Sequence, residues 1–458
     1  MKLRDLPTAA LVDRRARLGE RLGDRVGLVP AGAPSARNYA ANTYPYRAGS
    51  HFLYLAGWPL EGAYLRWAKG EWAVFAPERA ADDALWHGPG PSFDEVADAV
   101  GCRIRPLSEL RPFGAHRVAT VPAIDRATRA RQAELLGRSP TPPTEDDLVL
   151  HDALIALRLV HDEAARAGLR AAAEATTAAH RAGMAVTRPG ILEAEVRAAM
   201  EAECLKRGLG LAYPPIVTVH GEILHHRGHD GRLEHGDLLL ADVGAESAGG
   251  WAGDVTRTWP VAGAFSATQR DVYQVVLHAQ ERAIAAARPG VRYRDVHLTA
   301  ARALTEGLVE LGVLRGDVDE LVADGVHALL FPHGVGHLLG LDVHDMEDLG
   351  DRAGYAPGRQ RSDQFGLSYL RLDRDLAPGM AVTIEPGLYQ VPGILADADL
   401  TKIAKDRLDR SALARFADVR GIRIEDDVLV TEDGPEVLTA AIPKAIDAVE
   451  AAVGGPRG

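Results

Sequence analysis

The chain has 458 residues, of which 47% are hydrophobic and 25% are charged. That length can supply two domains with a sizeable core, and the composition is ordinary for a globular protein. The formal net charge of −12 argues against general binding to nucleic acid or to an anionic membrane surface. The two cysteines, Cys102 and Cys204, fit a reducing compartment better than a disulfide framework. The N-terminal segment has no apolar run of signal-peptide length, and no stretch reaches about 18 apolar residues, so we expect a cytoplasmic protein that does not cross a membrane.

The first part of the chain predicts a mixed α/β domain. A polar, aromatic loop is expected over 36–46. The segment SPTPPT at 139–144 is the clearest linker, and Thr144 followed by three acids is a good helix N-terminus. We therefore place the domains at residues 1–158 and 159–458. The expected helices cover 6–22, 93–100 and 145–158, and the expected strands cover 26–29, 51–57, 64–76 (with a turn at Lys69-Gly70) and 118–121.

The second part of the chain opens with long helical patterns. His180 lies within the first of them, where a packed or surface histidine is more common than a ligand. Acid- and histidine-bearing elements occur at 237–260 and again between 331 and 432. The expected helices cover 162–184, 192–206, 267–287, 293–311 and 317–330, and a strand is expected over 216–219.

Residues 237–260 contain two strand-like runs, and each run carries an acid, Asp242 in the first and Asp254 in the second. The turn cluster Ser247-Ala248-Gly249-Gly250 separates them. In a hairpin centred on Ala248 the two carboxylates lie opposite each other, roughly 5 Å apart at Cβ. Such a pair repels and is costly to desolvate, and a cation between the two removes both problems. On this hairpin alone, an aspartate that faces water or ends a strand is an equally good interpretation.

Three later motifs carry further chemistry. In FPHGVGHLLGLDVHD, His333, His337 and His344 lie among glycines that allow a ligand to approach closely, although a packed turn with solvated histidines would show the same pattern. In VTIEPG, Glu385 follows a β-branched run and precedes a strand-breaking Pro-Gly. In GIRIEDD, Arg423 and Glu425 share one face of a strand, and a surface ion pair is the alternative interpretation.

Taken together, these motifs supply four carboxylates and one imidazole. Such a set suits a pair of Mn²⁺, Co²⁺ or Zn²⁺ ions better than a structural zinc site. It can hold two metals about 3.5–4 Å apart, the spacing that activates a bridging water. The five residues are Asp242, Asp254, His337, Glu385 and Glu425.

The order Asp, Asp, HGxxH, TIEPG and RIED resembles the pita-bread metallopeptidases, which include methionine aminopeptidase, aminopeptidase P and prolidase. The resemblance covers about residues 160–440. TYPYRAGSHFLYLAGW (43–58) and LWHG (85–88) look like the N-terminal domain of the proline-specific branch, which methionine aminopeptidases lack. The resemblance implies an α/β (α+β) fold, with a creatinase-like N-terminal α/β domain followed by a pita-bread catalytic domain. All five metal ligands are present, which argues against the non-catalytic peptide-binding modules and the metal-free creatinase of this fold.

The resemblance also implies a role for each motif residue. Asp242 would bind one metal, His337 and Glu385 the other, and Asp254 and Glu425 would bridge the two. Glu385 would also move a proton to the proline nitrogen, while His225 and His344 would hold substrate and stabilise the oxyanion. His333, Arg423 and Tyr213 match accessory substrate-site residues. The spacing from Asp242 to Asp254 is one residue longer than in relatives, which predicts a bulge or a three-residue loop.

The stretch between His344 and Glu385 separates two activities within the proline-specific branch. Residues 346–380 resemble a prolidase insertion whose Leu-Arg pair faces the carboxylate of the C-terminal proline, and Leu370-Arg371 matches that pair. We therefore expect an Xaa-Pro dipeptidase, with aminopeptidase P acting on longer Xaa-Pro peptides as the alternative. A solvated basic loop would also explain Arg371, because Arg359, Arg361 and Arg374 lie nearby in the sequence. Two divalent ions, most simply Mn²⁺ with Co²⁺ or Zn²⁺ as alternatives, and a homodimer are expected from the same resemblance.

Overall fold

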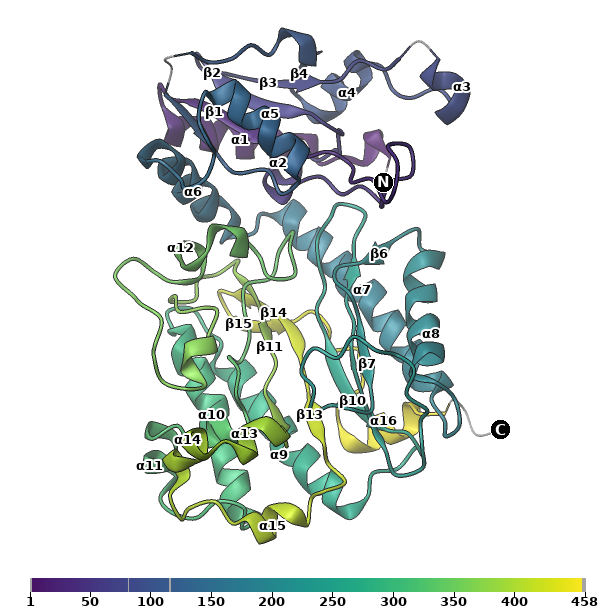
Figure 1. Cartoon of the computed structure of the whole chain (residues 1–458), viewed down its shortest axis with the longest axis vertical. Coiled ribbons are helices and arrows are strands. Elements are labelled where there is room, and N and C mark those ends of the chain that lie inside the picture. Colours follow the sequence, from purple (N-terminus) through teal and green to yellow (C-terminus); the bar gives the residue numbers. More distant parts are fainter. Residues whose placement is uncertain (1, 81, 115–116, 455–458) are drawn as a thin grey trace. The chain divides into compact units, whose positions relative to one another are not determined.

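The computed structural model describes residues 2–80, 82–114 and 117–454 (Figure 1). The chain forms two compact units, Met1–Ala164 and Ala165–Gly458. The boundary between these two units lies between Ala164 and Ala165. The domain boundary that we propose from the sequence motifs lies a few residues earlier, after residue 158. Among the described residues, no helix combines the length and the apolar character needed to cross a membrane.

The first unit is built on one mixed sheet. Its described part has five strands in the order β4-β3-β2-β1-β5, with β1 antiparallel to β2 and parallel to β5. A hydrophobic core cluster covers this sheet. It contains Leu28, Tyr64, Phe75 and Val118 from the strands and Leu135 from α5. The strands are β1 (Val26–Pro30), β2 (Tyr64–Ala68), β3 (Glu71–Ala76), β4 (Arg103–Pro106) and β5 (Val118–Thr120). The helices are α1 (Thr8–Leu22), α2 (Ser50–Ala56), α3 (Asp83–His87), α4 (Phe93–Val100), α5 (Arg126–Leu136) and α6 (Glu145–Arg158).

The prediction of a strand over 51–57 is wrong, because this segment forms helix α2. All seven residues of α2 are buried, and a short, continuously apolar run gives no periodicity that separates a strand from a buried helix. Gly57 ends the helix in the left-handed conformation, at φ +69°. The predicted start of α6 is confirmed, since the Thr144 side chain accepts a hydrogen bond from the backbone N–H of Asp147.

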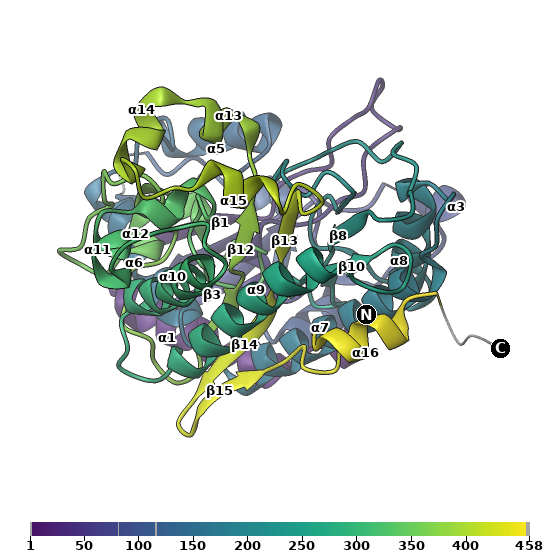
Figure 2. The ribbon, with the colours of Figure 1, turned by 90° about the horizontal axis from the view of Figure 1, so that it is seen from below.

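The second unit combines short strands with long helices. Helix α9 packs against β11, β12, β13 and β15 and lies alongside α10 (Figure 2). Its described strands pair in the orders β10-β8-β7, β11-β14-β15, β12-β13 and β6-β9. The strands are β6 (Gly210–Leu211), β7 (Ile216–Thr218), β8 (Leu238–Asp242), β9 (Ala245–Glu246), β10 (Thr256–Pro260), β11 (Ala381–Ile384), β12 (Gly387–Tyr389), β13 (Gly421–Arg423), β14 (Asp426–Thr431) and β15 (Gly434–Val437).

The long helical patterns of this unit form helices close to the expected bounds. The predicted helix over 317–330 is the exception, because Gly325 at φ +75° separates α11 from a short 3₁₀ turn, Val326–Leu329. The helices are α7 (Glu163–Val186), α8 (Glu193–Lys206), α9 (Ala267–Ala286), α10 (Tyr293–Glu310), α11 (Val318–Ala323), α12 (Asp351–Gly354), α13 (Pro392–Ala396), α14 (Ala398–Thr401), α15 (Arg410–Ala414) and α16 (Ile446–Ala452).

The hairpin of β8 and β10 corrects the predicted register. Asp242 lies opposite Thr256, not Asp254, because the hairpin is centred on Gly249 instead of Ala248. The pairing of the two strands continues toward the tip of the hairpin. The last hydrogen bond before the tip runs from the backbone N–H of Ser247 to the carbonyl of Trp251, at 2.8 Å. That pair encloses a three-residue loop, which the longer spacing of the two acids predicted. Asp254 therefore precedes β10 and lies diagonally across from Asp242.

Candidate active site

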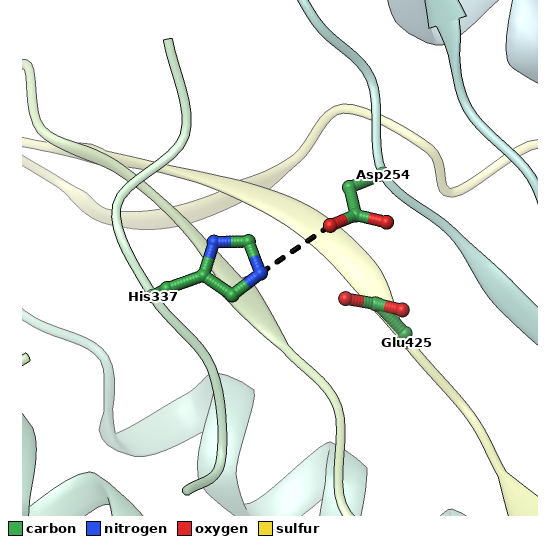
Figure 3. A group of neighbouring side chains, drawn as sticks. All are labelled: Asp254, His337 and Glu425. Carbon is green, nitrogen blue, oxygen red and sulfur yellow. Dashed lines mark ion pairs between the residues drawn. The ribbon is translucent and has the colours of Figure 1, made fainter. Parts of the chain in front are cut away.

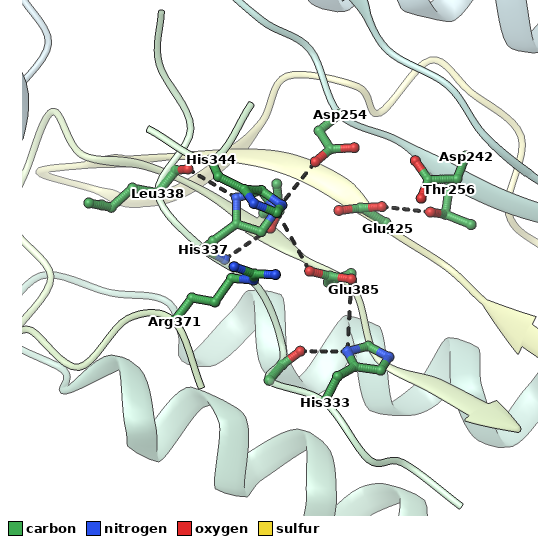
Figure 4. A network of polar contacts seen from close by, with 12 residues as sticks. Asp242, Asp254, Thr256, His333, His337, Leu338, His344, Arg371, Glu385 and Glu425 are labelled. Carbon is green, nitrogen blue, oxygen red and sulfur yellow. Dashed lines mark hydrogen bonds and ion pairs between the residues drawn. The ribbon is translucent and has the colours of Figure 1, made fainter. Parts of the chain in front are cut away.

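Five side chains that the sequence assigns to metal binding line one cavity of about 570 Å³ in the second unit (Figure 4). Each comes from a strand end or from a loop next to a strand. Asp242 ends β8, Asp254 precedes β10, Glu385 follows β11, and Glu425 lies between β13 and β14. His337 comes from the glycine-rich loop before the insertion. The structure therefore gathers residues that lie as much as 183 positions apart in the chain, from Asp242 to Glu425.

Close backbone contacts place His337 against β11. The backbone N–H of His337 donates to Thr383 Oγ1 at 3.1 Å, and the N–H of Thr383 donates to the carbonyl of His337 at 3.0 Å. Gly336, at φ +155°, allows this approach, since a Cβ there would clash with the carbonyl oxygen of Thr383. Pro386 has no backbone N–H and separates β11 from β12, which leaves Glu385 at the strand end.

The imidazole of His337 is oriented for ligand binding. Its Nδ1 lies 3.0 Å from the carbonyl oxygen of Leu338, so Nδ1 carries the proton and donates it there. The lone pair of Nε2 is then directed at Asp254 Oδ2, at 3.3 Å, and at Glu385 Oε1, at 3.7 Å. Asp254, His337 and Glu425 each offer one ligand atom, and these atoms lie within 4.8 Å of one another (Figure 3).

Burial makes the carboxylate cluster electrostatically unfavourable without cations. It raises the pKa of Asp254 to about 6 and that of Glu385 to about 8, and it raises the pKa of Asp242 and Glu425 as well. Neighbouring acids add to the shift at Glu385 and Glu425, because each charge disfavours the next. Burial also lowers the pKa of His337 to about 4, which keeps its imidazole neutral. Buried acids beside a neutral imidazole are the donor set that divalent metals use, so these residues fit such ions.

Tyr213 and Arg423 hold the outer side of Asp242. Tyr213 Oη donates to Asp242 Oδ1 at 2.6 Å, and Arg423 Nη2 donates to Oδ2 at 2.5 Å. Arg423 is 4% exposed and Glu425 is 2% exposed, and the ion pair of Arg423 is with Asp242. The alternative of a surface ion pair between Arg423 and Glu425 is therefore wrong. Their contacts place Tyr213 and Arg423 behind the carboxylate of Asp242, where they fix its orientation.

The remaining predicted histidines border the same cavity. His333 is half-buried, with Nδ1 2.8 Å from the carbonyl oxygen of Gly334 and Nε2 2.9 Å from Tyr389 Oη. His225 also lines the cavity, and burial lowers its pKa. The ring of His344 lies edge-on to that of His337, with the centroids 4.1 Å apart.

Sequence reasoning missed two residues that hold the cluster. Thr256 Oγ1 donates to Glu425 Oε2 at 2.6 Å and accepts from Arg423 Nε at 2.9 Å. Asp427 accepts from the backbone N–H of Asp254 at 3.1 Å. Thr256 could have been found from the strand alternation, because it lies two residues after Asp254 and so shares its face.

The insertion after His344 forms one wall of the cavity. Four of its side chains, Arg361, Phe365, Tyr369 and Arg371, line it. Arg371 Nη1 donates to both carboxylate oxygens of Glu347, at 2.7 and 2.8 Å. The alternative of a solvated basic loop stays open for Arg371, since its side chain is 39% exposed and pairs with Glu347, which is 41% exposed. Arg359 pairs with Asp375 on the same insertion and does not line the cavity.

Comparison with known proteins identifies the family. The sequence pattern of metallopeptidase family M24 matches residues 167–432, and that of the aminopeptidase P N-terminal domain matches residues 11–122. The chain belongs to metallopeptidase family M24. The expected resemblance and the expected two-part fold, an N-terminal domain of the aminopeptidase P type followed by the pita-bread catalytic domain, are thereby confirmed.

Relatives of both proline-specific kinds align over almost the whole chain. Human Xaa-Pro dipeptidase is 31% identical, covering 98% of this chain and 94% of the relative. Xaa-Pro aminopeptidase of Escherichia coli K12 is 32% identical, covering 96% of each. Among solved structures, Pseudomonas aeruginosa aminopeptidase PepP superposes with a TM-score of 0.80 at 32% identity, covering 98% of each chain. Zinc-substituted E. coli aminopeptidase P in complex with product superposes with a TM-score of 0.78 at 31% identity, again covering 98% of each chain.

Proposed function

We propose that this metallopeptidase hydrolyses the Xaa-Pro bond of Xaa-Pro dipeptides. The observation that carries the proposal is one cavity that contains both the buried carboxylate–histidine cluster and the guanidinium of Arg371. Relatives named Xaa-Pro dipeptidase and Xaa-Pro aminopeptidase support the substrate class. Homodimer formation stays a prediction from the resemblance, and a cytoplasmic location stays a prediction from the sequence composition.

The cluster would hold two divalent cations, with Mn²⁺ proposed first and Co²⁺ or Zn²⁺ as alternatives. The proposed ligands are Asp242, Asp254, His337, Glu385 and Glu425. When bound, such ions act as Lewis acids and lower the pKa of a bound water. The donor set supports the proposal, because four acids and a neutral imidazole line one cavity, and the ion pair of Arg423 goes to only one of the four, Asp242.

The proposed chemical step uses the side chains around this cluster. Glu385 is the proposed proton carrier, since its carboxyl lies 3.7 Å from His337 Nε2 and borders the cavity. It would take a proton from the attacking water and deliver it to the proline nitrogen as the amide bond breaks. His225 and His344 would hold the substrate and stabilise the negative charge that develops on the scissile carbonyl oxygen.

The insertion supplies the proposed dipeptide specificity. Arg371 Nη1 is occupied by Glu347, whereas Nε and Nη2 make no hydrogen bond to the described residues. Those two atoms form an edge that can bind a carboxylate with two parallel hydrogen bonds. Phe365 and Tyr369 lie on the same insertion, with ring centroids 6.3 Å apart, and offer an apolar surface for the proline ring.

Aminopeptidase P activity is the second candidate function. The observation that favours it is the Arg371–Glu347 ion pair, because it already neutralises the guanidinium without a substrate carboxylate. An enzyme of this kind would accept peptides that extend beyond the proline.

The test compares Ala-Pro with Ala-Pro-Ala, for the wild-type protein and for Arg371→Met. A charge-assisted bidentate contact is worth about 1.5–3 kcal/mol, or roughly 10- to 150-fold in specificity. We expect wild type to prefer the dipeptide by that factor and Arg371→Met to lose the preference through a higher KM for Ala-Pro. Arg359→Met is the matched control, because Arg359 lies on the same insertion but does not line the cavity. Equal kcat/KM for the two peptides, unchanged by Arg371→Met, would favour aminopeptidase P.

A further inference from the structure

Glu347 links the proposed carboxylate-binding arginine to the proposed catalytic histidine. Both of its oxygens accept hydrogen bonds from Arg371 Nη1, at 2.7 and 2.8 Å. Its Oε2 also lies 3.3 Å from His344 Nδ1. Although partial burial opposes the shift, the hydrogen bond from His344 and the charges of His344 and Arg371 lower the pKa of Glu347 to about 2. The carboxylate is therefore an anion near neutral pH.

A local turn brings Glu347 beside His344. Met346, at φ +60°, adopts the left-handed conformation, and Glu347 then begins a 3₁₀ turn, Glu347–Leu349. The backbone N–H of Glu347 donates to the carbonyl of His344 at 3.3 Å. This reversal places side chains three residues apart on the same side of the loop.

The backbone at Arg371 is fixed from the other side of the insertion. The carbonyl of Leu370 accepts from Tyr355 Oη at 2.7 Å and from Arg361 Nη1 at 2.8 Å. Gly354 packs directly on the carbonyl of Arg371, where a Cβ would clash. The long Arg371 side chain leaves this anchored backbone, and its hydrogen bonds to described residues go to Glu347 alone.

Two cavities meet at this bridge. The proposed substrate cavity and a smaller one of about 140 Å³ are both lined by Arg371, His344, His337 and Arg361. Glu347 lines the smaller cavity but not the larger one. It therefore reaches Arg371 and His344 from the side away from substrate, and it leaves their other nitrogens available to the larger cavity.

We propose that Glu347 is a positioning residue that sets both carboxylate recognition and the catalytic step. Through Nη1 it would fix the Nε–Nη2 edge of Arg371 against the proline carboxylate. Through Nδ1 it would fix the ring orientation of His344 beside the substrate. This inference rests on the proposed Xaa-Pro dipeptidase function and adds to it a single anion that couples the two halves of the site.

If Glu347 positions both Arg371 and His344, its substitution should change KM and kcat in different ways. It should raise KM only for a substrate with a carboxylate and lower kcat for every substrate, which a merely structural ion pair would not do. Glu347→Gln keeps the size of the side chain but offers one oxygen and an amide N–H₂ that repels the guanidinium. We expect KM for Ala-Pro to rise about tenfold, the loss of roughly one charge-assisted hydrogen bond. KM for Ala-prolinamide, which has no carboxylate, should not change. The kcat should fall for both substrates by a similar factor, because His344 serves both.

The experiment measures kcat and KM for both substrates with metal-loaded, full-length protein. The variants are wild type, Glu347→Gln, Arg371→Met and the double variant. If Glu347 acts on KM through Arg371, Glu347→Gln should not raise KM for Ala-Pro further in the Arg371→Met background, yet it should still lower kcat. Asp375→Asn is the control. It breaks the ion pair between Asp375 and Arg359 on the same insertion. Neither residue lines either cavity, so this variant should behave as wild type.

Three outcomes would overturn the inference. Unchanged kcat and KM in Glu347→Gln would show that the bridge positions nothing. Equal KM increases for Ala-Pro and Ala-prolinamide, or KM effects that add fully in the double variant, would show that Glu347 does not act through Arg371. A wild-type protein that cleaves neither substrate would instead refute the proposed function, and the inference with it. Equal metal content across the variants shows that each remains folded around the cluster.

Discussion

The carboxylate cluster and the insertion line the same cavity, but they are held in different ways. The cluster residues lie at strand ends and are nearly enclosed, with Asp254, His337 and Glu425 between 2% and 5% exposed. The two paired side chains of the insertion, Arg371 and Glu347, are 39% and 41% exposed, and they lie on an irregular loop and on a short 3₁₀ turn, respectively. A buried site on strands keeps its geometry when a loop changes, whereas a half-exposed loop can be altered at little cost to folding. The comparison places the proposed metal chemistry on the rigid part and substrate choice on the adaptable part.

The largest expected effect comes from the rigid part. Asp254→Asn should reduce hydrolysis of Ala-Pro to background, because a neutral amide cannot bridge two cations as a carboxylate does. The measurement is kcat with Mn²⁺ in excess, with Asp375→Asn as a surface control. Activity within tenfold of wild type would remove Asp254 from the proposed metal centre.

A smaller loss is expected from the histidines that border both regions. His344→Ala and His225→Ala should keep the metal content of wild type while kcat falls by about 10²–10³, the usual cost of one transition-state hydrogen-bond donor. Metal analysis and kinetics on the same preparations separate the two roles. Loss of an ion from His344→Ala would show that His344 is a metal ligand, and it would contradict the assignment of metal binding to the carboxylate cluster alone.

The third effect tests the support behind the cluster. Thr256→Val removes the hydroxyl that binds Glu425 Oε2 and Arg423 Nε. Loss of such an outer partner typically weakens metal affinity by about 10- to 100-fold. Titration of metal-free protein with Mn²⁺ measures this directly. Thr258→Val is the matched control, since the Thr258 hydroxyl donates to the backbone carbonyl of Arg423 and to no cluster carboxylate. Equal affinities in the two variants would show that Thr256 does not tune the site.

The same contrast explains what the sequence could predict. The cluster was predictable because an acid inside an apolar strand run is conspicuous, and strand periodicity indicates which residues share a face. The partner of Asp242 was missed by two positions, Thr256 instead of Asp254. Hairpin loop length is not fixed by the strand pattern, and the three-residue loop moves the centre by one residue, to Gly249. The error did not disturb the site, since Asp254 still lies diagonally across from Asp242 and lines the same cavity.

Features of the loops were less predictable. The contact between Glu347 and Arg371 depends on the left-handed backbone of Met346, and neither helical nor strand periodicity encodes that conformation. Helix α2 was missed for a related reason, because a buried apolar run of seven residues fits either kind of element. Residues that act through loop geometry, such as Glu347, became visible only in the three-dimensional arrangement.

The most direct test of the account is metal content measured together with hydrolysis of Ala-Pro. We expect two divalent ions per chain at full occupancy, loss of activity on chelation, and recovery when Mn²⁺ or Co²⁺ is added back. Activity should follow occupancy of the cluster across a titration of the metal-free protein. Undiminished hydrolysis of Ala-Pro by protein shown to contain no metal would contradict the account at its centre.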